Sequence, residues 1–162
     1  MIRPATTDDA RAIAAIYNHY ISRTAVTFET SPVSAPEMAR RIGEIGATGP
    51  YMVYCNDTDG RVLGYCYAHP WKERAAYALT YETSLYLAPE ICGRGIGTML
   101  LHRLIDECRR RDIHVLVACI TGDNTVSCHL HEKAGFCRVS CFREVGRKFG
   151  RWYDITDYQL IL

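Results

Sequence analysis

This sequence has almost no net charge and no long apolar run. The 162 residues include 19 Lys and Arg against 18 Asp and Glu, which gives a formal net charge of +1. So small a net charge supplies no overall field that would hold a nucleic acid or an anionic membrane. No apolar run approaches the roughly 18–20 residues that cross a bilayer, and Met-Ile-Arg-Pro at the start lacks the apolar stretch of a signal peptide. We therefore expect a cytoplasmic protein with no nucleic-acid or membrane partner.

Cysteine is abundant, but the Cys-x-x-Cys pairs typical of metal or redox sites are absent. Among the eight cysteines, Cys55, Cys66 and Cys119 lie in apolar, strand-like runs, where a free thiol behaves as a small buried hydrophobic side chain. Together with the missing signal peptide, this favours reduced thiols over disulfides. We expect no metal, although four side chains have a loosely zinc-like spacing: His129, His131, Cys137 and Cys141.

Repeats, low-complexity stretches and long linkers are also absent. Apolar residues make up 48% of the chain and charged residues 23%, which is the composition of an ordinary globular domain. A fold of this size buries roughly 70% of the surface of its unfolded chain, so its core needs no disulfide or metal for stability. We expect a single domain that spans residues 1–162.

Local signals divide the chain into strands and helices. Helix starts are indicated at Thr7-Asp8-Asp9, the Ser34-x-x-Glu37 capping box, the Gly95 end of a glycine-rich loop, and Asp123-Asn124-Thr125. Gly46 and Gly49-Pro50 are expected to end the second helix. Strands are predicted at residues 2–5, 51–55, 62–67, 78–87, 115–120, 136–145 and 152–162. The fold class is therefore α+β, a single mixed and mostly antiparallel sheet of about seven strands flanked by helices, in the order β-α-α-β-β-β-α-β-α-β-β.

A glycine-rich segment, Gly93-Arg-Gly-Ile-Gly97, joins a predicted strand directly to the longest predicted helix. Glycines let the backbone approach a ligand closely, and the free N–H groups at a helix start attract phosphate. The segment lacks the Lys-Ser/Thr of a Walker A loop and the spacing of the Gly-x-Gly-x-x-Gly dinucleotide fingerprint. A pyrophosphate site is therefore indicated, with a plain glycine-rich turn as the alternative.

The strand, glycine-rich loop, helix and next strand, followed by Asn124-x-x-Ser127 and Leu130-His-Glu-Lys-Ala-Gly-Phe136, resemble the GNAT superfamily of acyl-CoA-dependent N-acyltransferases. The resemblance covers the whole chain and implies acetyl-CoA as co-substrate, with its pyrophosphate on the loop and its pantetheine arm along the strand. Cys92 departs from the Arg or Gln usual in the family, and Arg94 is a candidate to compensate. The implied cofactor-binding residues are Leu85, Tyr86, Leu87, Gly93, Arg94, Gly95, Ile96, Gly97, Thr98, Asn124 and Ser127.

Separate motifs on the expected substrate side resemble a narrower group, the phosphinothricin and methionine sulfoximine acetyltransferases. These motifs are Ile16–Tyr20, Thr27–Thr30 with Pro32, Trp71–Arg74, Tyr77, Glu82, Leu130–Glu132 and Lys148–Asp154. The resemblance implies a homodimer that acetylates the α-amine of a small amino acid or analogue of the phosphinothricin, methionine sulfoximine or methionine sulfone type. Two alternatives stay open: an N-acetyltransferase for another amine (an ordinary amino acid, a polyamine or a protein N-terminus), and a CoA-binding sensor without turnover.

Two side chains are candidates for proton transfer. Glu82 is the only acidic residue in an otherwise apolar or hydroxyl-bearing strand, where burial would raise the pKa of its carboxyl toward neutrality, as suits a general base. The alternative is that Glu82 forms an ion pair with Arg74 or another cation. His131 is a candidate acid for the departing thiolate, and its alternative role is a hydrogen bond on the face of its helix.

An amino-acid substrate carries a carboxylate, and a guanidinium fork is the side chain that binds both carboxylate oxygens. Arg74, which stands just before the strand of Glu82, is therefore the candidate substrate anchor. Phe28, Tyr77 and Trp152 are candidate aromatic walls of the substrate pocket, although each also suits an ordinary core or surface position.

Overall fold

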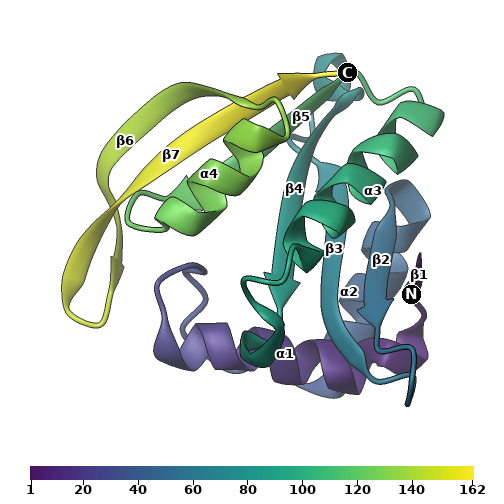
Figure 1. The fold of residues 1–162 in the computed structure, drawn as a ribbon. Coiled ribbons are helices and arrows are strands. Elements are labelled where there is room, and N and C mark those ends of the chain that lie inside the picture. The colour runs from purple at the N-terminus through teal and green to yellow at the C-terminus, as the bar shows by residue number, and fades with distance from the viewer.

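The computed structural model describes residues 1–162 and contains one seven-stranded sheet with four α-helices (Figure 1). The strands are β1 (Ile2–Pro4), β2 (Tyr51–Cys55), β3 (Val62–Pro70), β4 (Thr80–Leu87), β5 (Val115–Thr121), β6 (Cys137–Lys148) and β7 (Arg151–Ile161). The helices are α1 (Ala10–Arg23), α2 (Ala35–Thr48), α3 (Ile96–Arg110) and α4 (Thr125–Lys133). The predicted α+β class and element order are confirmed. No helix combines the length and the apolar character needed to cross a membrane.

The sheet is continuous but opens between two of its central strands. The strands lie in the order β1-β2-β3-β4-β5-β7-β6, and all neighbours run antiparallel except β4 and β5. The parallel ladder joins Thr80–Glu82 of β4 to Val115–Val117 of β5 and goes no further. Beyond these residues the two strands separate, which creates the gap that holds the candidate site.

The helices cover the two faces of the sheet in pairs. Cys66 of β3 faces α3, where its thiol donates to the carbonyl oxygen of Leu100 at 3.6 Å. Tyr51 of β2 lies on the opposite face, where its phenol is 4.0 Å from the sulfur of Met38 in α2. Figure 1 shows the same division, with α3 and α4 on one side of the sheet and α1 and α2 on the other. The main apolar cluster, of 32 buried residues, draws on both sides.

Helix α2 begins where the sequence predicts, but half of the expected capping box is wrong. The Ser34 hydroxyl accepts the backbone N–H of Glu37 at 3.3 Å. The Glu37 carboxylate does not return to the helix start; it binds Arg40 and Arg41, which lie one turn further along the same helix. The helix continues through Gly46, so an end at that residue is wrong, but it ends at Thr48 with Gly49 as its C-cap, as the predicted stop at Gly49-Pro50 requires.

All eight cysteines are free thiols, and Cys55 and Cys66 are buried as predicted. The predicted burial of Cys119 is wrong, because this side chain is exposed. Beyond Val117, β5 has lost β4 as its neighbour, so Cys119 lies beside an open gap rather than within a continuous sheet. No three His, Cys, Asp or Glu side chains form a group that could hold a metal ion, the four residues with zinc-like spacing included.

Candidate active site

The gap between β4 and β5 forms a cavity of about 610 Å³, within the usual range for small-molecule sites. Its walls come from β4, the glycine-rich loop with the start of α3, the end of β5, and α4. Ten of the residues predicted for cofactor binding or catalysis line it: Leu85, Tyr86, Leu87, Gly93, Gly95, Gly97, Thr98, Asn124, Ser127 and His131. The fold thus brings segments that are far apart in the sequence to one cavity.

The glycine-rich loop presents unpaired backbone donors. Gly93 and Gly95 have φ angles of 76° and 78°, a conformation that glycine adopts without strain. The N–H groups of Gly93, Arg94 and Gly95 donate no hydrogen bond within the chain. Helix α3 begins at the next residue, and the first N–H groups of an α-helix have no partner in the helix. The loop therefore offers adjacent donors and the positive end of a helix dipole to an anion.

The edge of β4 that faces the gap also carries free backbone groups. Just past the strand, the N–H of Ala88 donates to the carbonyl oxygen of Leu63 in β3 at 2.7 Å. Successive residues of a strand turn their N–H groups to opposite edges, so those of Leu85 and Leu87 point away from β3 and into the gap. The Leu87 carbonyl oxygen accepts the Tyr20 phenol at 2.6 Å.

Three predicted cofactor residues offer less of their side chains to a ligand than the sequence implied. The side-chain oxygen of Asn124 accepts the backbone N–H of Ser127 at 3.2 Å and so caps α4, which leaves its amide NH₂ group unbonded. The side chain of Ile96 is buried in the core, so only its backbone is available to a ligand. Arg94 is exposed and does not line the cavity.

Glu82 stands at the closed end of the gap, in the last residue pair of the parallel ladder. Its side chain is half-buried and does not itself line the cavity, whereas the next residues, Thr83 and Ser84, do. None of the ion pairs in the structure includes Glu82, so the alternative pairing with Arg74 is not formed. Glu82 thus forms no ion pair and lies one residue from the cavity.

The surroundings of Glu82 make its carboxyl easier to protonate. Burial raises the pKa of the carboxyl above its ordinary value, as the sequence predicted. His69, when it is protonated, and the neighbouring Cys119 thiol act against this rise, and the negative charge of Asp157 adds to it. A carboxylate of raised pKa is a better proton acceptor than an ordinary one, which is the property a general base requires.

His131 is buried in the wall of the cavity. Its Nδ1 lies 2.8 Å from the carbonyl oxygen of Ser127, which can only accept, so Nδ1 carries the proton. The ring meets Phe136 edge-on at 5.0 Å between centroids, and burial lowers the pKa of the imidazole. The neutral ring then has no proton at Nε2. This geometry supports the alternative role as a hydrogen bonder on the helix face, and the acid role stays a prediction.

The four predicted substrate residues do not share one pocket, and none of them lines the large cavity. Arg74 and Tyr77 lie together, in a separate hollow of about 470 Å³ that Lys72 and Glu73 complete. Arg74 has no ion-pair partner in that hollow, so its guanidinium is available to an anion.

Phe28 and Trp152 lie instead at the hairpin of β6 and β7. The Phe28 ring packs so closely on Gly146 that a Cβ at that glycine would be 2.1 Å from it. The ring centroids of Phe28 and Tyr153 are 6.2 Å apart. Trp152 is 57% exposed, and its one close cation is the Arg147 guanidinium at 5.7 Å from the ring.

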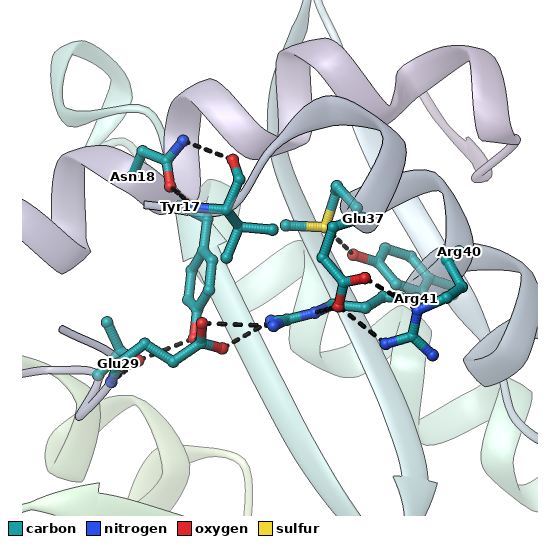
Figure 2. Close-up of polar contacts among 10 residues, drawn as sticks. Tyr17, Asn18, Glu29, Glu37, Arg40 and Arg41 are labelled. Atoms are coloured by element: carbon teal, nitrogen blue, oxygen red, sulfur yellow. Dashed lines mark hydrogen bonds and ion pairs between the residues drawn. The ribbon is translucent and has the colours of Figure 1, made fainter. Parts of the chain in front are cut away.

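A polar network that the sequence did not indicate holds the segment between α1 and α2 (Figure 2). The Tyr17 phenol and the Arg41 guanidinium donate to the same Glu29 carboxylate oxygen, at 3.0 and 2.6 Å. The Asn18 side chain binds both backbone groups of Val33, at 2.7 and 2.9 Å. The partners in these bonds are 12 to 15 residues apart, which is too far for a local sequence motif to predict them.

The same segment is tied to the far end of the chain. Buried Lys148 of β6 donates to the carbonyl oxygen of Thr27 at 2.7 Å, and the Thr27 hydroxyl lies 2.8 Å from the Tyr17 phenol. The Tyr17 ring meets Tyr86 of β4 at 5.1 Å between centroids. These contacts fix the segment beside the strand that carries Glu82.

Comparison with known proteins identifies the family. The sequence matches the acetyltransferase (GNAT) domain over residues 2–156. The chain belongs to the GNAT acetyltransferase family. It is 37% identical over 160 residues to the phosphinothricin N-acetyltransferase of Streptomyces coelicolor, with 98% of this chain and 94% of that protein covered. It is 38% identical over 161 residues to the L-methionine sulfoximine/L-methionine sulfone acetyltransferase of Salmonella typhimurium, with 99% and 94% covered.

Solved structures of the family agree with this fold. The GNAT phosphinothricin acetyltransferase of Sinorhizobium meliloti, in complex with AcCoA, superposes with a TM-score of 0.97 at 36% identity, covering 100% of this chain and 88% of that one. The ribosomal-protein-alanine N-acetyltransferase of Brucella melitensis superposes with a TM-score of 0.95 at 34% identity, covering 100% and 99%. The resemblance stated from the sequence motifs is confirmed, and the chain is a GNAT N-acetyltransferase.

Proposed function

We propose that this enzyme transfers the acetyl group of acetyl-CoA to the α-amine of a small amino acid or analogue of the phosphinothricin, methionine sulfoximine or methionine sulfone type. The observation that carries the proposal is the position of Glu82, an unpaired carboxylate of raised pKa at the closed end of the cavity. Two relatives are named as acetyltransferases of phosphinothricin and of methionine sulfoximine or sulfone, and these names support this acceptor class.

Acetyl-CoA in this proposal lies along the gap. The free N–H groups of the loop and of the start of α3 bind its pyrophosphate, from Gly93, Arg94, Gly95, Ile96, Gly97 and Thr98. The edge of β4 from Leu85 to Leu87 binds the pantetheine arm through backbone groups, and Asn124 and Ser127 contact the cofactor from the other wall. The open edge of β4 and the unpaired loop amides support this fit, because they are polar groups that otherwise lack partners. The thioester then lies at the Glu82 end.

The chemistry is direct transfer between the two substrates. Glu82 takes a proton from the ammonium group of the acceptor, and the free amine attacks the thioester carbonyl carbon. A backbone N–H from the Leu85 to Leu87 stretch stabilises the negative oxygen of the tetrahedral intermediate. The C–S bond breaks as the carbonyl re-forms, and CoA leaves as a thiolate that needs little help from an acid, because the pKa of a free thiol is only about 8.5. The thiolate then takes up the second proton of the attacking nitrogen, so that the products are the N-acetyl amine, CoA thiol and protonated Glu82. An acid role for His131 stays a secondary proposal.

The acceptor carboxylate binds Arg74 in this account, with Tyr77 beside it. Phe28 and Trp152 are proposed as aromatic walls, although one chain alone does not bring them to Arg74. We also propose that the enzyme is a homodimer. Large apolar side chains on the β6–β7 hairpin support this, since they are more than half exposed: Val139, Phe142, Val145, Phe149 and Trp152.

The test is the rate of CoA release from acetyl-CoA with a panel of acceptors. The panel contains L-phosphinothricin, L-methionine sulfoximine, L-methionine sulfone, the twenty amino acids, a polyamine and a peptide with N-terminal alanine. The proposal predicts the highest kcat/KM on the three analogues, and an Arg74→Ala variant that raises the KM for these acceptors but not for acetyl-CoA. Bound acetyl-CoA without turnover of any acceptor would favour a sensor.

A second candidate acceptor is a protein N-terminus. The similarity to the ribosomal-protein-alanine N-acetyltransferase of Brucella melitensis favours it, since identity and coverage are comparable with those of the relatives that act on small molecules. Turnover of the alanine peptide with none of the small analogues would establish this candidate and overturn the first.

A further inference from the structure

A row of polar side chains crosses the sheet on the face that carries Glu82. His69 of β3 lies directly opposite Glu82, and Glu82 pairs with Val117 of β5. Cys119 is two residues further along β5 and so projects from the same face as Val117. Across the next ladder, Cys119 lies directly opposite Asp157 of β7.

The outer end of this row is anchored. Ser140 of β6 pairs with Asp157, and its hydroxyl donates to the Asp157 carboxylate at 2.7 Å. Two carboxylates, Glu82 and Asp157, therefore flank one thiol, and burial together with these two neighbours raises the pKa of that thiol. Cys119 is exposed and lines the cavity, so the row reaches the closed end of the gap.

We propose that Asp157, acting through Cys119, and His69, acting from the other side, are positioning residues that hold Glu82 and tune its readiness to accept the proton of the acceptor. This proposal rests on the proposed role of Glu82 as the general base. Neither the glycine-rich loop nor the substrate hollow supplies any member of the row. The row thus supports the base from outside the loop and the hollow, and only Cys119 of the row also lines the large cavity.

The two ends of the row act on Glu82 with opposite sign. The negative charge of Asp157 disfavours a second negative charge nearby, so it favours protonated Glu82. His69, when it is protonated, and the neighbouring Cys119 thiol favour the carboxylate. His69 keeps its Nδ1 on the carbonyl oxygen of Pro70 at 2.9 Å, which leaves Nε2 free.

Glu82 has one more titratable neighbour on its own face. Tyr67 lies on β3, two residues before His69, and the charge of Glu82 contributes to the raised pKa of its phenol. The charges of Glu29 and Arg41, from the segment after α1 and from α2, act on Tyr67 with opposite sign. Tyr67, Glu29 and Arg41 are left unchanged in all variants of the test, so that their effect is the same throughout.

The experiment is the pH dependence of kcat/KM with the best acceptor of the panel, for Asp157→Asn, His69→Gln, Cys119→Ser and Cys119→Ala. Activity rises with pH as the base loses its proton. Asp157→Asn should therefore move the acidic limb to lower pH by about 0.5 unit, and His69→Gln should move it to higher pH by about as much, which is roughly a threefold change in kcat/KM on that limb. Cys119→Ser keeps a hydrogen-bond donor and should leave the acidic limb at the parent pH. Cys119→Ala removes the donor and should move the acidic limb to higher pH.

Controls separate the possible failures. Asp106→Asn removes the same charge from an exposed position of α3 and should leave the limb in place, because screened distant charges have little effect. Suppose that Glu82→Gln abolishes turnover while Asp157→Asn and His69→Gln both leave the acidic limb at the parent pH. The positioning role of the row is then overturned, and the role of Glu82 as the base stands. If Glu82→Gln retains full turnover, the proposed role of Glu82 as the base fails, and the row fails with it, whereas the acetyl transfer itself is tested by the acceptor panel. Should Asp157→Asn unfold, the two Cys119 variants and His69→Gln decide the question, and identical limbs in those three overturn the row.

Discussion

Glu82 and Val117 form the last residue pair of the parallel β4–β5 ladder, and the two strands separate directly beyond it. The acidic side chain of β4 therefore stands where the sheet opens. One wall of the opening is an edge of β4 with unpaired backbone groups, and its far end is a loop with unpaired N–H groups. A single departure from regular pairing thus places a proton acceptor, a polar strand edge and an anion cradle along one cavity.

Gly95→Ala should weaken acetyl-CoA binding. A Cβ at Gly95 meets no atom within 4 Å, so its cost of about 1–2 kcal/mol comes from the positive φ, and relief of that strain would shift the loop N–H groups. We expect the KM for acetyl-CoA to rise several-fold. Gly60→Ala is the matched control, because Gly60 has a similar φ and equally open surroundings in the turn between β2 and β3. Gly60→Ala should lose comparable stability in urea unfolding and keep the parent KM for acetyl-CoA. An equal rise of this KM in both variants would count against pyrophosphate binding by the glycine-rich loop.

Asn124 has two proposed tasks that substitution can separate. Asn124→Ala removes the cap of α4 and should lower the free energy of unfolding by about 1 kcal/mol. Asn124→Asp keeps a capping oxygen but replaces the free NH₂ group by negative charge beside the proposed cofactor. Its free energy of unfolding should stay near the parent value while the KM for acetyl-CoA rises. An unchanged KM in Asn124→Asp would mean that the residue serves as a cap alone.

Gly146 and Phe28 should show strong energetic coupling. A Cβ at Gly146 would lie 2.1 Å from the Phe28 ring, so Gly146→Ala should destabilise the fold by about 1–3 kcal/mol through overpacking. In the double variant Phe28→Ala/Gly146→Ala the ring is gone, and the alanine then has room. Urea unfolding of the four proteins of the cycle should show that the double variant loses less than the two single losses combined. Additive losses would contradict the close packing.

The buried ring of His131 should make stability depend on pH. Its pKa is lowered from 6.5 by burial, so below about pH 6.5 the unfolded chain binds a proton that the folded chain resists. The free energy of unfolding should therefore fall as pH drops through this window. In His131→Gln this part of the pH dependence should be absent, measured by urea unfolding at pH 7.5 and 5.5. His129→Gln, at an exposed position of the same helix, should retain the parent dependence.

The element order follows from local chemistry, which is why the sequence predicts it. Ser34 caps α2 and Asn124 caps α4 through side-chain oxygens that accept N–H groups three residues on, a relationship visible in the sequence. The glycine-rich loop likewise announces the start of α3. The position of Glu82 in an apolar strand was enough to predict its raised pKa.

Long-range relationships could not be predicted in this way. Cys119 is exposed because β4 separates from β5 before this residue, and the apolar run around Cys119 contains no signal of that separation. Asp157 reaches Glu82 only because β7 pairs with β5 in one particular register. The Glu37 carboxylate could accept from the backbone N–H at the helix start or from the two arginines one turn further along. It binds Arg40 and Arg41, because a charged donor forms a stronger hydrogen bond with a carboxylate than a backbone N–H does.

The most direct test of the account is a comparison of Glu82→Gln with the parent enzyme, in CoA release at saturating acetyl-CoA and best acceptor, and in acetyl-CoA affinity by calorimetry. The exposed Glu44→Gln variant of α2 serves as control for loss of a carboxylate. The account predicts that kcat falls by roughly 100-fold or more in Glu82→Gln alone, as expected for loss of a general base, while the Kd for acetyl-CoA stays within about twofold. A Glu82→Gln variant with the parent kcat would contradict the assignment of Glu82 as the base.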